Sequence, residues 1–534
     1  MSTTQTLARA GLIVSIAFLV SRLLGYVRGI AMATTFDAGQ SLDSFFAAFR
    51  LPDLIFQLVA AGALSSALIP IVSGLFATDE EARAWRIVST VTSLMLVALL
   101  VLAVVAFVAA PLIVPAMTPG WAGIRLERTI ELTRIMLLSP IFLALGSIAT
   151  SALNAKGRFA AAAVAPSVYN LGLILGAIVL APALGSVGPD GVVVPNPAGL
   201  AVGVVIGSIG HVAVQLPPLV RLGFRFEPRI HLEDTLARKA LVLMAPRAIG
   251  LGATQITFVA MTVLASDLPD GSLSAFNLAM LLLQIPLGVI GVPLGIVLLP
   301  ALSRELATGS VETFLGMIGR ALRLLVFVML PIAALGIVLS RQVVDLLFGY
   351  GAFSALAVER TATTLLVFLF GLAAHALIAV LARAFYAGQD TRTPVIAAIS
   401  AVVVNVTVGI LAVEPFGLQG LALAIAAGAW LEAAILLVVL RARYAGLDLR
   451  ALVATVGRSL AGALVAGGLA FGTIGSLGAL FGTDPDKLAV LGQTVLAAGV
   501  GAVGYLAMSF VLRVPELPAL IAVATELVRR PRGS

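Results

Sequence analysis

Hydrophobic residues in this chain come in long, nearly unbroken runs rather than in the one-sided stripes of a soluble helix. The runs at 87–109 and 490–512 are the clearest, and each exceeds the ~20 residues that a helix needs to cross a bilayer core. Fourteen such segments can be counted, and the pattern predicts an all-α polytopic membrane protein. We expect its helices near 9–35, 44–76, 84–109, 126–154, 160–182, 197–222, 237–266, 274–302, 313–340, 360–387, 393–413, 418–441, 452–475 and 488–512.

The polar positions between these segments alternate in charge. Connections after even-numbered segments are basic, and they contain Arg83, Arg86, Lys156, Arg158, Arg221, Arg225, Arg229, Arg304, Arg392, Arg441, Arg443 and Arg450. Connections after odd-numbered segments are mostly acidic, and they contain Asp37, Asp43, Asp190, Asp267, Asp270, Glu414, Asp484 and Asp486. Because basic loops remain in the cytoplasm, the pattern predicts an even number of spans with both termini cytoplasmic. Only Arg125, Arg341 and Lys487 depart from it.

The chain also repeats itself at an interval of about 230 residues. The segment 67–73 (ALIPIVS) is similar to 297–303 (VLLPALS), and 154–159 (NAKGRF) precedes Asn170 much as 386–392 (YAGQDTR) precedes Asn405. The repeat unit is six helices. Since six is even, both copies insert in the same orientation and are related by a pseudo-two-fold axis along the membrane normal.

This repeat predicts the organisation of the chain in three parts. We expect an N-lobe at 1–228 (helices 1–6), a C-lobe at 229–444 (helices 7–12), and two additional helices with a cytoplasmic tail at 445–534.

Composition narrows the class of function. Hydrophobic residues make up 60% of the 534 positions and charged residues 11%, with a mean hydropathy of +1.12, which excludes an ordinary soluble domain. There is no Cys and only three scattered His, so we expect neither thiolate chemistry nor a metal site. No nucleotide-binding loop or catalytic constellation occurs. The sequence therefore predicts a carrier or scaffold without a cofactor, not an enzyme. The net charge of +7 does not indicate nucleic-acid binding, because in a membrane protein the location of the positive charges matters more than their sum.

Two arginines stand in the first hydrophobic segment, where a membrane span normally has none. A charged side chain at the bilayer centre costs at least ~2.5–3.5 kcal/mol and usually faces a bundle interior or a watery cavity. Arg22 lies 13 residues beyond Arg9, or about 20 Å along a helix, too deep to reach the cytoplasmic side easily. Arg28 points about 120° away from Arg22 on a regular helix, so the two converge only through their length or through a break near Gly25. They are candidate anion ligands; pairing with a carboxylate or with helix-end carbonyls is the alternative.

Further charged residues fall in other predicted spans. Asp43 and Arg50 lie seven residues apart on one helix face and could bracket the outer mouth of a cavity, or sit at the interface in the ordinary way. Pro52 should kink that helix. Arg247 follows a proline in the seventh segment and could add positive charge to the same cavity or cap a broken helix. Glu432 is a candidate proton or ion site, or a structural partner of a base.

Three stretches of this sequence resemble a known family. They are 21–28 (SRLLGYVR), 43–52 (DSFFAAFRLP) and 286–300 (PLGVIGVPLGIVLLP), and they are similar to motifs of the MurJ (MviN) lipid II flippases. The resemblance implies the fold of the multidrug/oligosaccharidyl-lipid/polysaccharide exporter superfamily. It also implies movement of lipid II, a peptidoglycan precursor on undecaprenyl pyrophosphate, from the inner to the outer leaflet of the bacterial cytoplasmic membrane, with cell-wall synthesis proteins as candidate partners.

The same resemblance assigns roles to individual residues. Arg22 and Arg28 would line a cationic cavity for the pyrophosphate, and Asp43 matches another functionally important position. Several positions depart from the family pattern, in which basic or acidic residues are usual: they are Gly29, Phe56, Gln57, Met280, Leu281 and Gln284. Either Arg50 and Arg247 replace the missing charge, or the cargo is another anionic polyprenyl lipid.

The expected mechanism is alternating access between the two lobes. An inside-negative membrane potential favours outward movement of an anion by about 2.3 kcal/mol per charge per 100 mV. Three rival functions remain open: a cation-coupled exporter of the same superfamily, which should place acids rather than arginines in its first helix; a flippase for an O-antigen or capsule oligosaccharide lipid; and an inactive scaffold for cell-wall enzymes.

Overall fold

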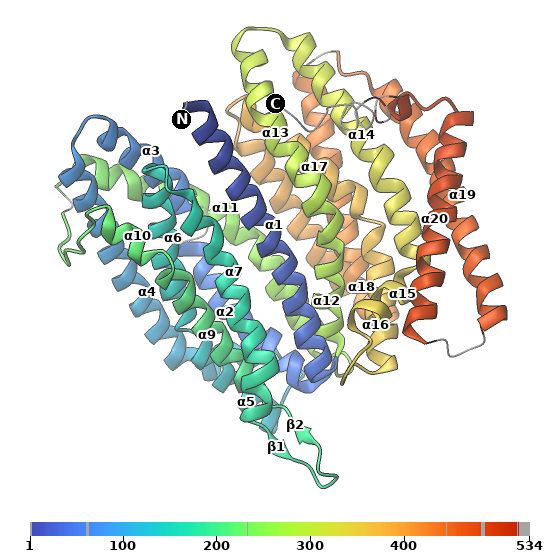
Figure 1. Cartoon of the computed structure of the whole chain (residues 1–534), viewed down its shortest axis with the longest axis horizontal. Coiled ribbons are helices and arrows are strands. Elements are labelled where there is room, and N and C mark those ends of the chain that lie inside the picture. The colour runs from blue at the N-terminus through green and yellow to red at the C-terminus, as the bar shows by residue number, and fades with distance from the viewer. Residues whose placement is uncertain are drawn as a thin grey trace. The chain divides into compact units, whose positions relative to one another are not determined.

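The computed structural model describes residues 3–59, 63–231, 233–444, 446–481, 486–518, 520 and 522, except for the side chains of 3–13, 59, 63–67, 241, 243–254 and 479–481. The described chain is almost entirely helical (Figure 1). By internal contacts it divides into two compact units, Met1–Ser274 with Gly351–Ser354, and Ala275–Tyr350 with Ala355–Ser534.

The first unit contains α1 (Thr3–Phe36), α2 (Gln40–Val59), α3 (Ala63–Ala77), α4 (Glu81–Met117), α5 (Gly123–Met136), α6 (Ser139–Ala155), α7 (Phe159–Leu175), the π-helix η1 (Gly176–Leu180), α8 (Ala181–Ala183), the hairpin strands β1 (Ser186–Val187) and β2 (Val193–Val194), α9 (Ala198–Ala213), α10 (Leu216–Arg221) and α11 (Thr235–Ser266). The helix α12 (Ser272–Pro286) begins at its edge. The rest of the chain forms the π-helix η2 (Leu287–Gly291), α13 (Val292–Ala307), α14 (Val311–Val338), α15 (Ser340–Phe348), α16 (Ala355–Leu369), α17 (Leu372–Ala387), α18 (Arg392–Arg443), α19 (Leu449–Phe481) and α20 (Lys487–Val511).

The polytopic helical membrane fold predicted from the sequence is confirmed. Among the described residues, ten helices are long and apolar enough to cross a membrane, or eleven if α16 and α17, which are bent by 48°, form one span. All fourteen predicted segments fall on helices. The two segments near 393–413 and 418–441 both belong to α18, which changes direction at Gly417 (φ 55°). The count of fourteen spans remains a prediction.

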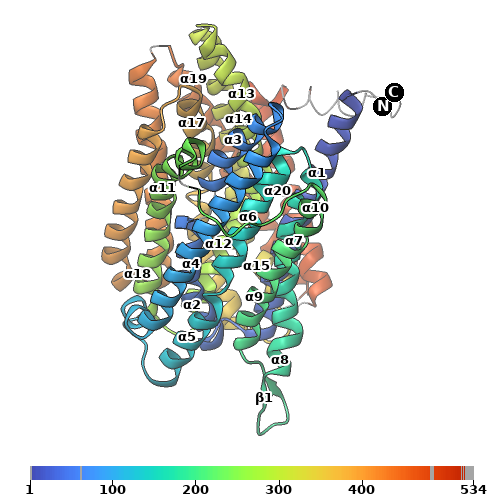
Figure 2. The same ribbon diagram turned by 90° about the vertical axis from the view of Figure 1, so that its left-hand side faces the viewer.

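Glycines bring the helices of the first unit into close contact. A Cβ atom added at Gly172 of α7 would lie 2.3 Å from the Cα atom of Gly207 in α9, and one at Gly176 would lie 2.9 Å from the Cα atom of Gly203. Small residues of this kind let membrane helices approach until their backbones touch. α7 is thereby fixed against α9 on one side, and it packs along α1 on another, as Figure 2 shows from the side.

The two C-terminal helices pack on α14 within the second unit. The Tyr505 hydroxyl donates to the carbonyl of Phe327 over 2.5 Å, and Arg323 of α14 forms a 2.8 Å ion pair with Glu516, which follows α20. The compact units differ from the predicted lobes, because α11 packs against α2, α3 and α4 and so belongs with the first unit. The division into two lobes of six helices stays a prediction.

Candidate functional site

Arg28 is held by an amide rather than by a carboxylate. Its Nη1 donates to Asn170 Oδ1 of α7 over 3.1 Å, and the Asn170 Nδ2 donates over 3.1 Å to the carbonyl of Ser21, about two turns earlier on α1. Gly25 faces this contact, and a Cβ atom there would lie 3.9 Å from Asn170 Nδ2, an ordinary van der Waals distance. The guanidinium is therefore oriented but keeps its full positive charge.

Arg22 has no hydrogen bond or ion pair within the described part of the chain. Its guanidinium lies 5.1 Å from the ring centroid of Phe18, one turn earlier on the same helix, at the distance of a cation–π contact. α1 runs unbroken through Gly25, so a helix break does not bring the two arginines together. The side chain of Arg22 is half-buried and stays available to an incoming anion.

Asp43 lies in a saturated hydrogen-bond network. Its carboxylate is 2% exposed and accepts from the backbone N–H groups of Gly271 and Ser274 at 2.8 Å, from the Ser274 hydroxyl at 2.6 Å, and from Arg125 Nη2 at 3.1 Å. The N–H of Gly271 lies just before α12 and that of Ser274 in its first turn, where backbone N–H groups lack partners within the helix. Asp43 therefore acts on α12 as a capping side chain does, although it comes from α2.

Arg125 completes the same network from the start of α5. Besides Asp43 it pairs with Asp270 over 2.6 Å, and its guanidinium lies 3.7 Å from the ring centroid of Trp121. Gln40 also donates to Asp270, over 2.8 Å. Sequence reasoning noted Arg125 only as an exception to the charge alternation. A base standing among acidic connections was the signal that could have led to its carboxylate partners.

Arg50 and Asp53 form a second polar cluster on α2, facing α11. The Arg50 Nε donates to the hydroxyl of Thr262 over 3.1 Å, and its guanidinium lies 5.1 Å from the ring centroid of Phe258. Asp53 accepts from Gln255 Nε2 at 3.1 Å. Arg50 and Asp43, predicted to bracket one mouth, thus belong to two separate sets of contacts.

The remaining predicted residues lie apart from these clusters. The side chain of Arg247 is outside the described residues. Glu432 of α18 belongs to the second unit, is half-buried, and has no hydrogen bond or ion pair among the described residues. The described residues also contain no group of three or more His, Asp or Glu that could hold a metal ion.

Charged residues in the connections between spans are paired in the ordinary way. Arg83 donates to both carboxylate oxygens of Asp234, and this hydrogen bonding holds the pKa of Asp234 below its usual value. Asp390 lies between α17 and α18. Burial raises its pKa, but hydrogen bonds from Thr393, Arg443 and the Arg392 backbone outweigh that effect and leave the pKa at about 2.

The arrangement separates two kinds of arginine. Arg125 lies between carboxylates and is neutralised, whereas the described surroundings of Arg22 and Arg28 offer no carboxylate partner. A guanidinium at membrane depth without an ion pair can bind phosphate oxygens through parallel N–H groups, because it stays charged and planar. The first helix can thus hold an anion, whereas the Asp43 network can hold helices together.

Comparison with known proteins identifies the family. A family model described as lipid II flippase MurJ matches residues 32–483. A probable lipid II flippase MurJ from Vibrio cholerae serotype O1 is 30% identical, covering 82% of this chain and 83% of its own length. The lipid II flippase MurJ of Burkholderia cenocepacia is 32% identical, covering 82% and 84%.

Solved structures agree in fold. A structure of lipid II flippase MurJ in an inward closed conformation has a TM-score of 0.75 and 22% identity, covering 94% of this chain and 99% of that one. An inward-facing multidrug resistance MATE family transporter of the MOP superfamily has a TM-score of 0.64 and 16% identity, covering 81% and 98%. With its apolar spans and a family model that matches most of its length, this chain is a multi-pass membrane protein that belongs to the lipid II flippase MurJ family.

Proposed function

We propose that this protein moves lipid II from the inner to the outer leaflet of the cytoplasmic membrane by alternating access. The observation that carries the proposal is the pair of α1 arginines, Arg22 and Arg28, for which the described residues contain no carboxylate partner. A pyrophosphate would supply the missing negative charge. The names of the curated relatives support lipid II as the cargo.

In this mechanism the protein binds the headgroup and the bilayer retains the lipid tail. Arg28, held by Asn170, offers its remaining N–H donors in a fixed direction, and Arg22 swings to meet the phosphate. Arg50 and Arg247 are further candidate ligands by sequence. Asp43 we assign to positioning, since its oxygens already accept four hydrogen bonds. The membrane potential would favour outward movement of the bound anion.

We further propose that both termini lie in the cytoplasm. The three basic residues that oppose this orientation each have a carboxylate partner: Arg125 pairs with Asp43 and Asp270, Arg341 with Glu359 at 3.6 Å, and Lys487 with Asp345 at 2.6 Å. The positive-inside rule counts Lys and Arg residues rather than net charge, so these three residues remain exceptions to it. The larger number of Lys and Arg residues in the other connections supports the proposed orientation.

The experiment is complementation of a strain depleted of its own lipid II flippase. Arg22→Ala and Arg28→Ala should each fail to support growth at wild-type protein levels. Arg134→Ala is the matched control and should complement fully. Arg134 of α5 also lies over a phenylalanine, 4.8 Å from the ring centroid of Phe107, but its Nε already donates to the Phe107 carbonyl over 3.2 Å. Full rescue by both α1 variants would overturn the assignment of the site.

A second candidate is a flippase for a different polyprenyl-pyrophosphate oligosaccharide. Where the resembling family often has two arginines, this chain has Phe56 and Gln57, and Gln57 lies within 3.5 Å of the Asp53 carboxylate. The carboxylate of Asp53, where the family often has nearby arginines, favours a headgroup that carries less negative charge or that presents hydroxyl groups to α2. Comparing the binding of lipid II with that of an O-antigen lipid by the purified protein separates the two candidates.

A further inference from the structure

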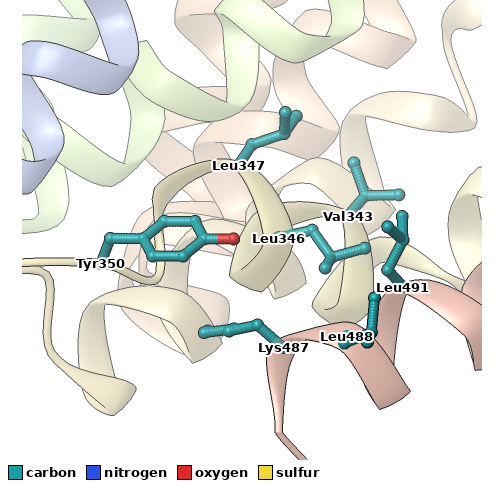
Figure 3. A pocket seen from close by; sticks show the side chains of 7 residues that line it. All are labelled: Val343, Leu346, Leu347, Tyr350, Lys487, Leu488 and Leu491. Atoms are coloured by element: carbon teal, nitrogen blue, oxygen red, sulfur yellow. The ribbon is translucent and has the colours of Figure 1, made fainter.

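A pocket of about 550 Å³ opens in the second unit between α15 and the first turn of α20 (Figure 3). Its volume is within the range of sites that bind small molecules. Its residues belong to the second unit, whereas the α1 arginines belong to the first. The residues that line it are Val343, Leu346, Leu347, Tyr350, Lys487, Leu488 and Leu491.

The walls of this pocket are mostly aliphatic, because the residues of α15 that line it are spaced so that they share one face of the helix. Val343, Leu346 and Leu347 stand at positions i, i+3 and i+4, which share one face of a helix. Val344 and Phe348, one position on from the first and last of these, are 0% and 1% exposed in the core of the unit. The helix α15 is therefore fixed by one face and offers the other to the pocket.

The polar groups of the pocket gather at one rim. The Lys487 ammonium donates to Asp345 Oδ1 over 2.6 Å and to the Asp345 carbonyl over 3.3 Å, and it lies 5.1 Å from the ring centroid of Tyr350. An ammonium has three N–H donors, and the described residues provide no acceptor for the third. The Tyr350 hydroxyl points inward toward Leu346 (Figure 3). One ammonium donor and one hydroxyl thus stand beside an apolar interior.

The pocket lies at the end of a membrane span. α20 begins at Lys487 and its 25 residues extend about 38 Å, enough to cross a bilayer. Leu488 is 75% exposed and Leu491 47%, so the α20 wall is open to the surroundings of the span. Water gains little in a cavity with so few polar partners. At the edge of a bilayer, the molecules available to occupy such a pocket are lipids, which have a hydrocarbon chain and a polar headgroup.

We propose that this pocket binds a membrane phospholipid, with one acyl chain between α15 and α20 and the phosphate at the rim formed by Lys487 and Tyr350. The apolar walls suit the chain, and the third N–H donor of the Lys487 ammonium and the Tyr350 hydroxyl can donate to phosphate oxygens. Lysine and tyrosine at a membrane boundary place their polar ends at headgroup level in the same way. This site is separate from cargo transport and does not depend on the proposed function.

The test uses the full-length protein in vesicles that contain phosphatidylglycerol with a photoreactive group at the end of one acyl chain. Peptide mapping should find labelling concentrated at 343–350 and 487–491. Leu491→Trp fills the pocket and should lower the labelling of 343–350 by about tenfold, the change that ~1.4 kcal/mol produces. Leu496→Trp is the matched control on the same helix, because Leu496 is 51% exposed and lies outside the pocket lining; it should leave the labelling unchanged.

A second variant tests the headgroup. Lys487→Gln should lower labelling by the phospholipid probe but not by a diacylglycerol probe that carries the same photoreactive chain. Labelling no stronger here than along the rest of the lipid-facing surface, or equal loss in the Leu491→Trp and Leu496→Trp variants, would overturn the proposal. So would labelling by a polyprenyl phosphate probe in place of the phospholipid. Equal thermal midpoints of the variants and the wild type establish that binding, not folding, has changed.

Discussion

The first unit places arginines in two contrasting environments. Arg125 lies between two carboxylates, Asp43 and Asp270, and stacks on an indole ring. Arg22 and Arg28 lie on a membrane helix with only a ring and an amide as described partners. The guanidinium is protonated in both environments, but only in the first is its positive charge balanced by carboxylates of the protein.

The difference indicates what each charge is for. Removing one partner from a buried ion pair leaves the other charge uncompensated, so the protein depends on such a pair for stability. A charge without an ion pair inside a membrane protein is instead a default sign of a ligand or transport path. We therefore expect changes around Asp43 to affect folding, and changes around Arg28 to affect the binding of an anion.

The largest effect should come from removing the buried carboxylate. Asp43→Ala leaves Arg125 and the first turn of α12 without their acceptor, and we expect the free energy of unfolding to fall by about 3–5 kcal/mol. Thermal denaturation of the purified protein measures it. Asp270→Asn is the control, since Asp270 is 48% exposed at its side chain and should contribute only about 0–1 kcal/mol. Equal effects of the two variants would remove the contrast.

A smaller and more selective effect should follow from converting one environment into the other. Asn170→Asp places a carboxylate beside Arg28 and turns it into a neutralised pair. We expect the affinity for an anionic polyprenyl lipid to fall by about 10- to 100-fold, equivalent to ~1.4–2.8 kcal/mol. The substitution also removes the N–H that Asn170 donates to the Ser21 carbonyl, so Asn170→Ala, which lacks that donor but adds no charge, is the control. Equilibrium binding of lipid II to the wild type and both variants measures the change. Unchanged affinity would mean that the charge of Arg28 does not attract the ligand.

The smallest effect concerns an ion pair of the second unit, Asp390 with Arg443. The pKa of Asp390 is about 2 in the folded protein, below its ordinary 3.8, so its contribution to stability is fully present above pH 4 and is lost as the pH falls through 2. Its partner Arg443 is half-exposed, which limits the contribution to about 1 kcal/mol or less. The free energy of unfolding of the wild type should therefore fall slightly more between pH 4 and pH 2 than that of Asp390→Asn. Identical pH profiles would contradict this assignment.

The sequence predicted the helices and the α1 arginines because both are local signals. Apolar runs identify spans, and a charge within a run is visible without any knowledge of the fold. It could not predict the partners of Asp43, because Gly271 and Ser274 lie 228 and 231 residues away, and no local pattern encodes that approach. The amide partner of Arg28, 142 residues away, escaped for the same reason.

Arg50 shows the limit of a local signal. The sequence places this charge on α2 before Pro52, but its contact with Thr262 depends on how α11 packs, and its role in binding stays a prediction. Likewise, the exceptions Arg125, Arg341 and Lys487 were visible as departures from the charge alternation. Only the folded chain supplies the carboxylates that accompany them.

The central claim is that the α1 arginines bind the anionic headgroup. The most direct measurement is the affinity of the purified protein for lipid II, compared among wild type, Arg22→Ala, Arg28→Ala and the control Arg134→Ala. Since a hydrogen bond to a charged group contributes about 1.5–3 kcal/mol, each α1 variant should bind roughly 10- to 150-fold more weakly while Arg134→Ala binds normally. Affinities of both α1 variants equal to that of the wild type would contradict the account.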